Sequence, residues 1–284
     1  MIGAGLSTGD ASITVVIPVW DRYVSYLEAA IDSVRRDAPD ARIVVVDNAS
    51  TLPVIPAPGV SLVRAPRRLS VGAARNLGLD HVATKYVALL DADDEFLPGT
   101  LDFLRSRLDS DSTVSVSATS AIDSATGRRH RFPKRPVARL TRWRRLFALL
   151  HSIWSLYPIQ GCSLLRTAQV RDAGGYPDVD WGDDWVLAVS LAFRGRVELH
   201  ERPGRRYRDN PGSLWRGGRE PGELARSTRL VRQRLRDDRG VPTWARRSVP
   251  LIAVLQLVAL HVLRPAYVAA QRLRSGARQT PRAG

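Results

Sequence analysis

Cysteine is nearly absent from this sequence. Its single copy, Cys162, cannot form an intramolecular disulfide bond, and chains without disulfides are typical of reducing compartments. We therefore expect a cytoplasmic protein. Residues Met1–Ser12 carry no Lys or Arg and no long apolar core, so they are unlike a secretory signal and are expected to form a loose leader.

The chain also lacks a long apolar run. Its most apolar late stretch, Val249–Leu263, is interrupted by Pro250, Gln256 and His261 and is shorter than the ~20 residues that a membrane-spanning helix needs. The flanking basic residues are Arg246, Arg247 and Arg264. This pattern is typical of a helix in the interface of an anionic membrane, and a C-terminal helix packed on the protein is an equal alternative.

Several catalytic patterns are missing. The five histidines show no metal-ligand spacing, and no Gly-x-Gly-x-x-Gly turn follows the first expected strand, which excludes a Rossmann dehydrogenase. The Gly-rich basic loop of a nucleotidyltransferase is replaced there by Ile17-Pro18-Val19-Trp20. No interleaved aromatic ladder is present, which disfavours an RNA- or DNA-binding protein.

Positive charge is concentrated in two regions. The formal net charge is +15, residues 201–284 contain 19 Arg against 6 acidic residues, and residues 128–145 contain 9 basic residues and no acidic one. The rest of the chain is net acidic. An acidic body with basic ends favours contact between those ends and an anionic surface over general nucleic-acid binding.

Strand and helix patterns alternate through the first hundred residues. Short β-branched runs that end at turn residues are typical of buried parallel strands, and apolar residues at helical spacing lie between them. The expected strands are Ile13–Ile17, Ile43–Val46, Ser61–Arg64 and Tyr86–Leu90, and the expected helices are Tyr23–Arg36, Val71–His81 and Pro98–Leu108. This order predicts an α/β fold with a doubly wound, mostly parallel sheet flanked by helices.

The second half is expected to extend the sheet and then become helical. Its expected elements are a strand pair in Ser110–Ser124, a helix over Val137–Ile153 with Leu140, Trp143, Phe147 and Leu150 on one face, a strand at Cys162–Leu165, a helix at Asp183–Phe193 and a strand at Val197–His200. Past about Gly217 the sequence becomes Arg-rich. We therefore expect a catalytic domain over residues 13–216 and a helical basic extension over residues 217–284.

Carboxylates follow one of the expected strands directly. The apolar run Val87–Leu90 ends in Asp91-Ala92-Asp93-Asp94-Glu95, and ligands bind at the carboxyl ends of strands in open α/β sheets. Asp91 and Asp93 point the same way if the strand continues. Carboxylate oxygens suit Mg²⁺ or Mn²⁺, which leave coordination positions for substrate phosphates. The location favours a metal-assisted diphosphate site over a solvated acidic turn.

A small-residue segment opens the helix expected at Val71–His81. It contains Gly72, Ala73 and Ala74 before Arg75 and Asn76. Small residues allow a ligand to approach the backbone, and a helix N-terminus favours an anion. Close packing of the helix on the sheet is the alternative use of the same residues.

Taken in order, these segments resemble the family 2 glycosyltransferases of the GT-A fold. The matching segments are Val16–Arg22, Val45–Ser50, Gly72–Gly78, Asp91–Asp94, Gly174–Tyr176 and Trp181–Trp185. The resemblance implies transfer of a sugar from a nucleotide-diphosphate donor to an acceptor hydroxyl with inversion. A nucleotidyltransferase of related fold is the alternative, and a basic nucleic-acid-binding protein is a weaker one.

The resemblance also implies roles for single residues. The nucleotide-binding residues would be Pro18 and Asp21 in the pocket, Asp47 on the base, Arg75 on the nucleotide and Asp91 on the ribose. Asp93 would bind Mn²⁺ or Mg²⁺, and Asp184 would be the catalytic base beside Asp183. A plain helix cap is the alternative for this acidic pair, and it fits Asp183 better.

Partners follow from the same interpretation. We expect a nucleotide-sugar donor, a saccharide or lipid-linked acceptor as in cell-envelope polysaccharide synthesis, and no nucleic acid. If the basic segments meet an anionic membrane surface, the protein would lie peripherally on the inner face of the plasma membrane.

Three features depart from the family pattern. Asp47-Asn48-Ala49-Ser50 stands where Asp-Asp-Gly-Ser is common, and Asn210 stands where His is common. No Gln-x-x-Arg-Trp run follows Asp184, which disfavours processive polymer synthesis.

Overall fold

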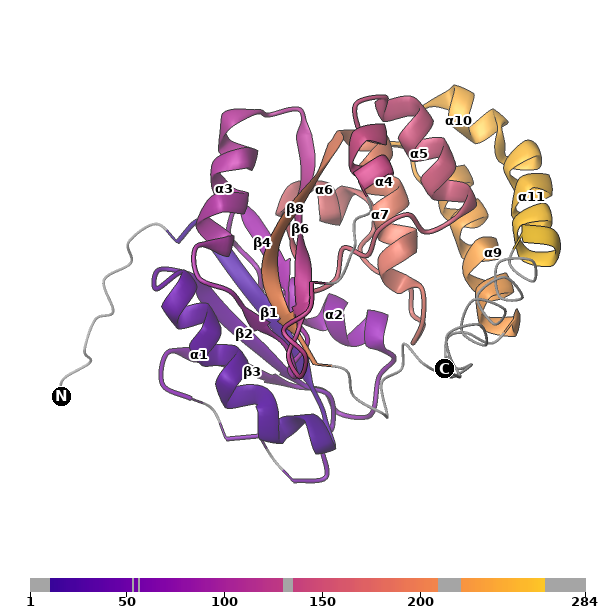
Figure 1. Ribbon diagram of the computed structural model, residues 1–284. Helices are drawn as coiled ribbons and strands as arrows, with labels where there is room; N and C mark the ends of the chain where they lie inside the picture. The colour runs from indigo at the N-terminus through magenta and orange to yellow at the C-terminus, as the bar shows by residue number, and fades with distance from the viewer. Residues whose placement is uncertain (1–10, 53, 56, 130–134, 209–220, 264–284) are drawn as a thin grey trace, which may run out of the picture.

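The computed structural model describes residues 11–52, 54–55, 57–129, 135–208 and 221–263, and their strands form one sheet with helices on both faces (Figure 1). The order of the strands is β3-β2-β1-β4-β7-β6-β8-β5. Their bounds are β1 Ile13–Val19, β2 Arg42–Asp47, β3 Val60–Arg64, β4 Tyr86–Leu89, β5 Glu95–Phe96, β6 Val114–Asp123, β7 Ser163–Arg166 and β8 Arg196–Tyr207. Residues 1–10 of the expected leader and the boundary at residue 216 fall outside the described residues.

The sheet is mixed. Strands β3, β2, β1 and β4 run parallel, as do β6 and β8, whereas β7 is antiparallel to both β4 and β6, and β5 is antiparallel to β8. The predicted α/β class with a largely parallel sheet is confirmed. Because β1, β2 and β4 are parallel neighbours, their carboxyl ends meet at one edge, where the sequence places its candidate residues.

Alternation along β1 separates two cores. Val15, Ile17 and Val19 face a cluster with α1 (Leu27–Asp37) and α3 (Thr100–Ser110), while Val16 faces the opposite cluster. The helices on that second face are α2 Val71–Leu79, α5 Arg144–Ile153, α6 Thr167–Asp172, α7 Asp183–Arg194 and α9 Pro221–Asp237 (Figure 1). The described part of the basic extension is helical and adds buried residues to this core, among them Val231, Leu235, Ala245 and Ile252.

The carboxylate of Asp37 joins two helices on the first face. It lies at the end of α1 and accepts hydrogen bonds from the backbone N–H groups of Thr100 (2.9 Å) and Leu101 (2.8 Å), which open α3. Gly99, the N-cap residue of α3, has no side chain for this purpose. A carboxylate from a neighbouring helix therefore satisfies donors that a helix start leaves unpaired.

Two element predictions in the second half are wrong. Ser110–Ser124 holds one strand, β6, because α3 continues to Ser110. The helix expected over Val137–Ile153 is divided into α4 (Arg135–Leu140) and α5, since the N–H of Trp143 bonds the carbonyl of Leu140 in a tight turn. As a result Phe147 is buried whereas Trp143 is 63% exposed, so the four apolar residues named above do not share one face.

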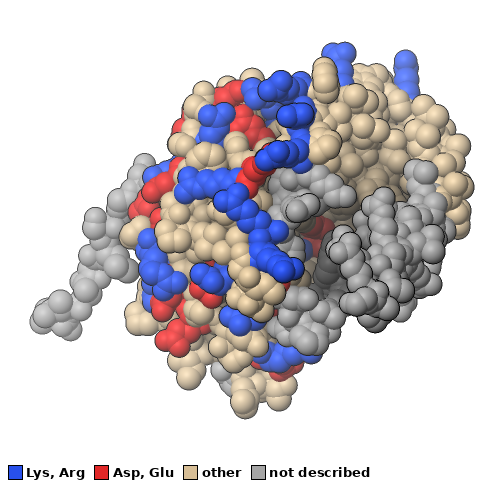
Figure 2. Space-filling view, in the orientation of Figure 1, with Lys and Arg blue, Asp and Glu red and all other residues tan. Residues whose placement is uncertain are grey.

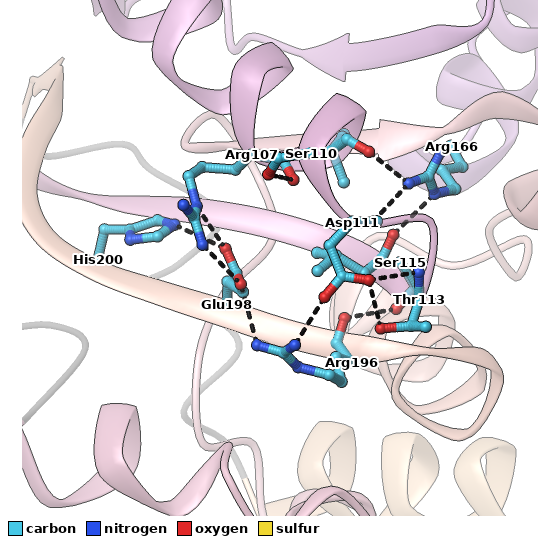
Figure 3. A network of polar contacts seen from close by, with 11 residues as sticks. Arg107, Ser110, Asp111, Thr113, Ser115, Arg166, Arg196, Glu198 and His200 are labelled. Carbon is cyan, nitrogen blue, oxygen red and sulfur yellow. Dashed lines mark hydrogen bonds and ion pairs between the residues drawn. The ribbon is translucent and has the colours of Figure 1, made fainter.

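A charged network fixes the edge of the sheet opposite the candidate site. At the amino ends of β6 and β8, Arg107 of α3 donates two hydrogen bonds to Glu198 at 2.9 and 3.1 Å, as Figure 3 shows. Arg196 bonds both Glu198 (3.1 Å) and Asp111 (2.7 Å). Glu198 is almost fully buried and therefore needs these partners.

Candidate active site

The loops after β1 and β2 are joined at the edge where these strands end. The backbone N–H of Asp21 donates to Ser50 Oγ at 3.1 Å, and the N–H of Thr51 donates to the Asp21 carboxylate at 2.7 Å. Asp21 is exposed and Pro18 is partly exposed. Ala49 has a φ of +54°, a left-handed conformation that glycine adopts without steric cost. The alanine thus adopts the geometry of the glycine that is common in the family pattern.

Asp47 is held inside the same loops. It is 1% exposed, its Oδ1 accepts the N–H of Ser50 at 2.9 Å, and its Oδ2 pairs with Arg64. The side chain of Asn48 bonds both backbone groups of Leu69, at 2.8 and 3.0 Å. Both residues therefore fix the loop after β2 through contacts with the protein itself.

The first backbone N–H groups of α2 already donate hydrogen bonds to other groups of the protein. The N–H groups of Val71, Gly72 and Ala73 donate to the Asp180 carboxylate (3.0 Å), the carbonyl of Val179 (3.0 Å) and Ser70 Oγ (3.1 Å). A Cβ on Gly72 would lie 1.9 Å from the carbonyl oxygen of Pro177. The small residues serve packing against the loop over residues 177–180, and the expected anion site at this helix start is wrong.

Asn76 fixes the turn that leads to α7. Its side chain accepts the N–H of Tyr176 at 2.9 Å and donates to the carbonyl of the same residue at 2.8 Å. Gly175 has a φ of +64°, and a Cβ there would approach Asn76 Oδ1 to 2.5 Å. The Gly-Gly-Tyr segment is therefore held against α2 by the side chain of Asn76.

Arg75 connects Asp91, which follows β4, to Asp183, which opens α7. Its guanidinium donates to Asp183 Oδ2 at 2.5 Å and to Asp91 Oδ1 at 3.2 Å, and its side chain is 7% exposed. Although burial opposes the charge, the carboxylates of Asp183 and Asp91 raise the pKa of Arg75 above its ordinary value. Gln160 donates to the same Asp91 oxygen at 3.2 Å. Asp91 is thereby oriented by two donors while staying partly exposed.

Asp184 lies in the first turn of α7. One of its oxygens accepts the backbone N–H of Trp185 at 2.8 Å, and the Trp185 ring donates to the carbonyl of His151 at 2.6 Å. Burial and the neighbouring charge of Asp183 raise the pKa of Asp184 to about 6. Because Asp183 is bound to Arg75 and Asp184 is partly exposed, Asp184 is the member of the pair that can receive a proton from a ligand.

The acidic residues that follow β4 have different environments. Asp94 is buried, accepting Arg205 at 2.7 Å and the N–H of Arg208 at 3.0 Å. Burial raises the pKa of Asp94 to about 7, against the effect of Arg205. Gly161 makes room for the Arg205 side chain, since a Cβ there would approach it to 2.4 Å. Asp93 is partly exposed.

The structure brings Arg75, Asp91, Asp183 and Asp184 together. Two residues that bind the acidic run after β4 were not predicted from the sequence. Gln160 and Arg205 are far in sequence from their acidic partners, and neither belongs to a recognisable motif. Arg68, whose guanidinium carbon lies 3.7 Å from the centre of the Trp20 ring, was missed for the same reason. Asn210 lies outside the described residues.

The model of glycosyl transferase family 2 matches residues 14–172. The chain is 26% identical over 220 residues to the succinoglycan biosynthesis protein ExoO of Rhizobium meliloti, covering 72% of this chain and 62% of that protein. It is 29% identical over 198 residues to the pre-mycofactocin glycosyltransferase of Mycobacterium tuberculosis, covering 64% and 39%. The chain thus spans less than two thirds of the length of these relatives.

Solved structures support the fold. Residues 1–349 of TarS from S. aureus, in complex with UDP, align with a TM-score of 0.63 at 14% identity, over 89% of this chain and 73% of that one. The complex of the same protein with UDP-GlcNAc aligns with a TM-score of 0.62 over 84% and 70%. With a family model that matches more than half of its length, the chain belongs to glycosyl transferase family 2.

Proposed function

We propose that this protein transfers a sugar from a nucleotide-diphosphate donor to an acceptor hydroxyl with inversion of the anomeric configuration, and that Asp184 is the base. One observation carries the proposal. Arg75 joins Asp91, at the end of β4, to Asp183, at the start of α7, and so places Asp184 beside the strand edge where ligands bind in this class of sheet.

The donor side is assigned to the loops that follow β1, β2 and β4. Pro18 and Asp21 line the nucleotide pocket, and Asp91 contacts the ribose with support from Arg75. Asp47 contacts the base; since both of its oxygens already accept hydrogen bonds, this contact uses a remaining lone pair of the carboxylate. The UDP in the TarS complex supports a nucleoside diphosphate as the leaving group.

The chemical step is a single displacement. The acceptor hydroxyl gives its proton to Asp184, its oxygen forms a bond to the anomeric carbon, and the bond to the diphosphate breaks on the opposite face. General-base assistance of this kind contributes about 100- to 10,000-fold in rate. Asp183, neutralised by Arg75, holds the first turn of α7 in position and stays outside the proton transfer.

The residues present fit a divalent cation. Among the described residues, no group of three His, Cys, Asp or Glu side chains is arranged to hold a metal ion. Mg²⁺ and Mn²⁺ in diphosphate sites need only one or two carboxylates together with phosphate oxygens, and the partly exposed Asp93 is such a ligand. When bound, the cation would stabilise negative charge on the leaving diphosphate.

The acceptor is proposed to be a saccharide or lipid-linked saccharide of the cell envelope, handled at the cytoplasmic side. The succinoglycan biosynthesis role in the name of one relative supports a saccharide. No helix in the described ranges is long and apolar enough to cross a membrane.

A donor panel tests the proposal. Purified protein is incubated with UDP-, GDP- and dTDP-sugars and Mn²⁺ or Mg²⁺, released nucleoside diphosphate is measured, and the anomeric configuration of the product is read by NMR. We expect turnover of one donor class, inversion, and loss of both metal dependence and turnover in Asp93→Ala. A product with retained configuration would exclude the single displacement.

A further inference from the structure

Exposed apolar side chains gather on one side of the protein. Eleven of the thirteen large apolar residues that are exposed in the described structure lie on α5, α10 (Thr243–Arg247), α11 (Val249–Val258), the π-helix η2 (Ala259–Leu263) and their caps. They are Trp143, Leu146, Leu150, Trp154, Trp244, Leu251, Val254, Leu255, Leu257, Val258 and Val262. We call this set the α5–α11 surface; the other two exposed residues, Leu52 and Ile55, lie between β2 and β3.

Helix α11 buries its polar side chain and exposes apolar ones. Gln256 is the single polar residue among its ten, and it is fully buried, donating to the carbonyl of Ser152 at 2.8 Å and accepting from Arg232. Leu251 and Val254, on the solvent side, are 61% and 56% exposed. A helix that is apolar on all sides is normally buried in protein or in lipid, so the outer face of α11 is built for a partner.

The α5–α11 surface is continuous from one end of α5 to the other. Arg145 lies 6.0 Å from the Trp244 ring at the start of α5, and the bond between Gln256 and Ser152 joins α11 to its end. At the starting end, a groove of about 770 Å³ lies between α5 and α10, lined by Trp143, Leu146, Phe193 and Trp244 together with Arg144 and Arg145.

The two stretches of chain that build the surface carry charge of one sign. The sequence has no Asp or Glu in residues 124–171 or in residues 239–284, the two stretches that supply this surface. Arg142, Arg144, Arg145 and Arg247 are exposed within it. Figure 2 shows an almost uncharged area over α10 and α11, with blue residues at its upper margin and no red residue within it. Apolar side chains, Trp residues and a basic margin are the composition of a protein face that enters an anionic lipid interface.

We infer that the α5–α11 surface docks on a bilayer containing anionic lipid. The apolar side chains enter the acyl boundary, the Trp rings lie at the headgroup level, and the Arg residues meet lipid phosphates. A second copy of the chain would need acidic residues to complement these Arg side chains, and the stretches that build this surface contain none.

The surface leads toward the candidate base. Helix α5 runs antiparallel to α7, since Arg144 bonds the carbonyl of Phe193 at one end (2.6 Å) and Trp185 bonds the carbonyl of His151 at the other (2.6 Å). Trp154 therefore lies at the end of α7 that carries Asp184. In a consequence that rests on the proposed function, the acceptor hydroxyl reaches Asp184 from the membrane side, and the nucleotide donor enters from the opposite, aqueous side.

Vesicle flotation of the full chain tests the inference. We expect binding to phosphatidylcholine vesicles that contain phosphatidylglycerol, weakening with salt, and weaker binding to phosphatidylcholine alone. The variant Leu251→Gln/Val254→Gln/Val258→Gln should lose affinity by on the order of tenfold or more, because these side chains no longer enter the acyl region. Arg142→Glu/Arg145→Glu should lose about thirtyfold or more in affinity for anionic vesicles, because each change removes an attraction and adds a repulsion.

Matched variants serve as controls. Leu52→Gln/Ile55→Gln makes the same chemical change at exposed apolar residues elsewhere, and Arg42→Glu/Arg67→Glu makes the same change in charge; both should float like the natural chain. Circular dichroism and thermal unfolding verify that every variant folds. Absence of flotation by the natural chain at low salt, or equal flotation of the surface variants and their controls, would overturn the inference.

Two further measurements separate the remaining outcomes. Light scattering in solution should give a monomer; a dimer that the apolar variant dissociates would assign the surface to a second copy and overturn the lipid inference. Asp184→Asn should float like the natural chain. Lost flotation with intact sugar transfer therefore contradicts the membrane surface alone, and intact flotation without any sugar transfer contradicts the proposed function alone.

Discussion

Single residues divide the proposed site into a binding part and a reacting part. Asp184→Asn keeps the shape of the side chain and an oxygen for the N–H of Trp185, and it removes the proton acceptor. We expect kcat to fall by about 100- to 10,000-fold while donor affinity, measured by calorimetry, stays unchanged. Asp172→Asn, at an exposed carboxylate of α6, is the control. An equal loss of donor affinity would place Asp184 in the nucleotide site.

Because the pKa of Asp184 is raised, we expect kcat to fall with pH in the acidic range. The base must be ionised, and its pKa is about 6. Turnover should therefore be constant at higher pH and should fall about tenfold for each pH unit below about 6. A pH profile of kcat checks this, and the limb should be absent from the residual activity of Asp184→Asn. A profile that stays flat down to pH 4 in the natural protein would contradict the assignment.

Ala49 adopts the conformation of a glycine at φ +54°. A non-glycine residue in this region costs about 1–2 kcal/mol. Glycine would remove this cost, but its greater conformational entropy in the unfolded chain would offset part of the gain in stability. We expect Ala49→Gly to raise the free energy of unfolding by about 0.5–1 kcal/mol, measured by denaturant titration. Ala29→Gly, on the exposed side of α1, should lower it by about 1 kcal/mol. Equal losses in both variants would show that Ala49 is not strained.

At the scale of elements, the start of α2 and the loop over residues 177–180 form one unit. Gly72→Ala places a methyl group against the backbone carbonyl of Pro177, and a carbonyl that is fixed by the chain cannot move cheaply. We expect a loss of about 1–3 kcal/mol in stability together with a lower kcat, because the loop leads to Asp183 and Asp184.

The control for this variant is another glycine in the first turn of a helix. A Cβ on Gly222 of α9 would meet no heavy atom within 4 Å, so Gly222→Ala should stabilise the protein by about 0.5–1 kcal/mol. Thermal unfolding and steady-state kinetics of both variants provide the comparison. If Gly72→Ala behaves like Gly222→Ala, the contact with Pro177 does not hold the loop.

Helices and strands could be predicted where the spacing of apolar residues in a short segment specifies them. The apolar strands β1, β2 and β4 and the apolar helix α7 lie close to their expected ranges. The break between α4 and α5 was missed because Leu140 and Phe147 keep helical spacing across the turn that separates the two helices. Gln160 and Arg205 were missed because their partners, Asp91 and Asp94, are brought near only by the folded sheet.

At the scale of the whole molecule, the stabilising network around Glu198, drawn in Figure 3, lies at the amino ends of β6 and β8, whereas the proposed site lies at the carboxyl ends of β1, β2 and β4. Glu198→Gln removes, at a nearly buried position, the charged partner of Arg107 and one of the two carboxylate partners of Arg196, which keeps Asp111. We expect a loss of about 1–3 kcal/mol in stability, with donor affinity unchanged. Thermal unfolding and calorimetry measure the two quantities separately.

Glu201→Gln is the matched control for this network. Glu201 pairs with Arg135 at 3.2 Å, and both side chains are more than half exposed. Exposed ion pairs contribute little, so this variant should change stability by less than about 0.5 kcal/mol. A change in donor affinity in Glu198→Gln would show that the two edges of the sheet are coupled.

The position of Arg75 between two carboxylates has a consequence for how such a site can evolve. Changing Arg75 alone leaves the buried carboxylate of Asp183 without its charged partner, which typically costs about 3–5 kcal/mol, whereas changing Asp91 or Asp183 alone leaves Arg75 with one carboxylate of two. Lineages would therefore have to pass through a poorly folding intermediate if Arg75 changed first. In an alignment of close relatives, these positions should vary as a correlated trio, while neighbours such as Asp93, whose partner would be a bound ion, follow the donor chemistry instead.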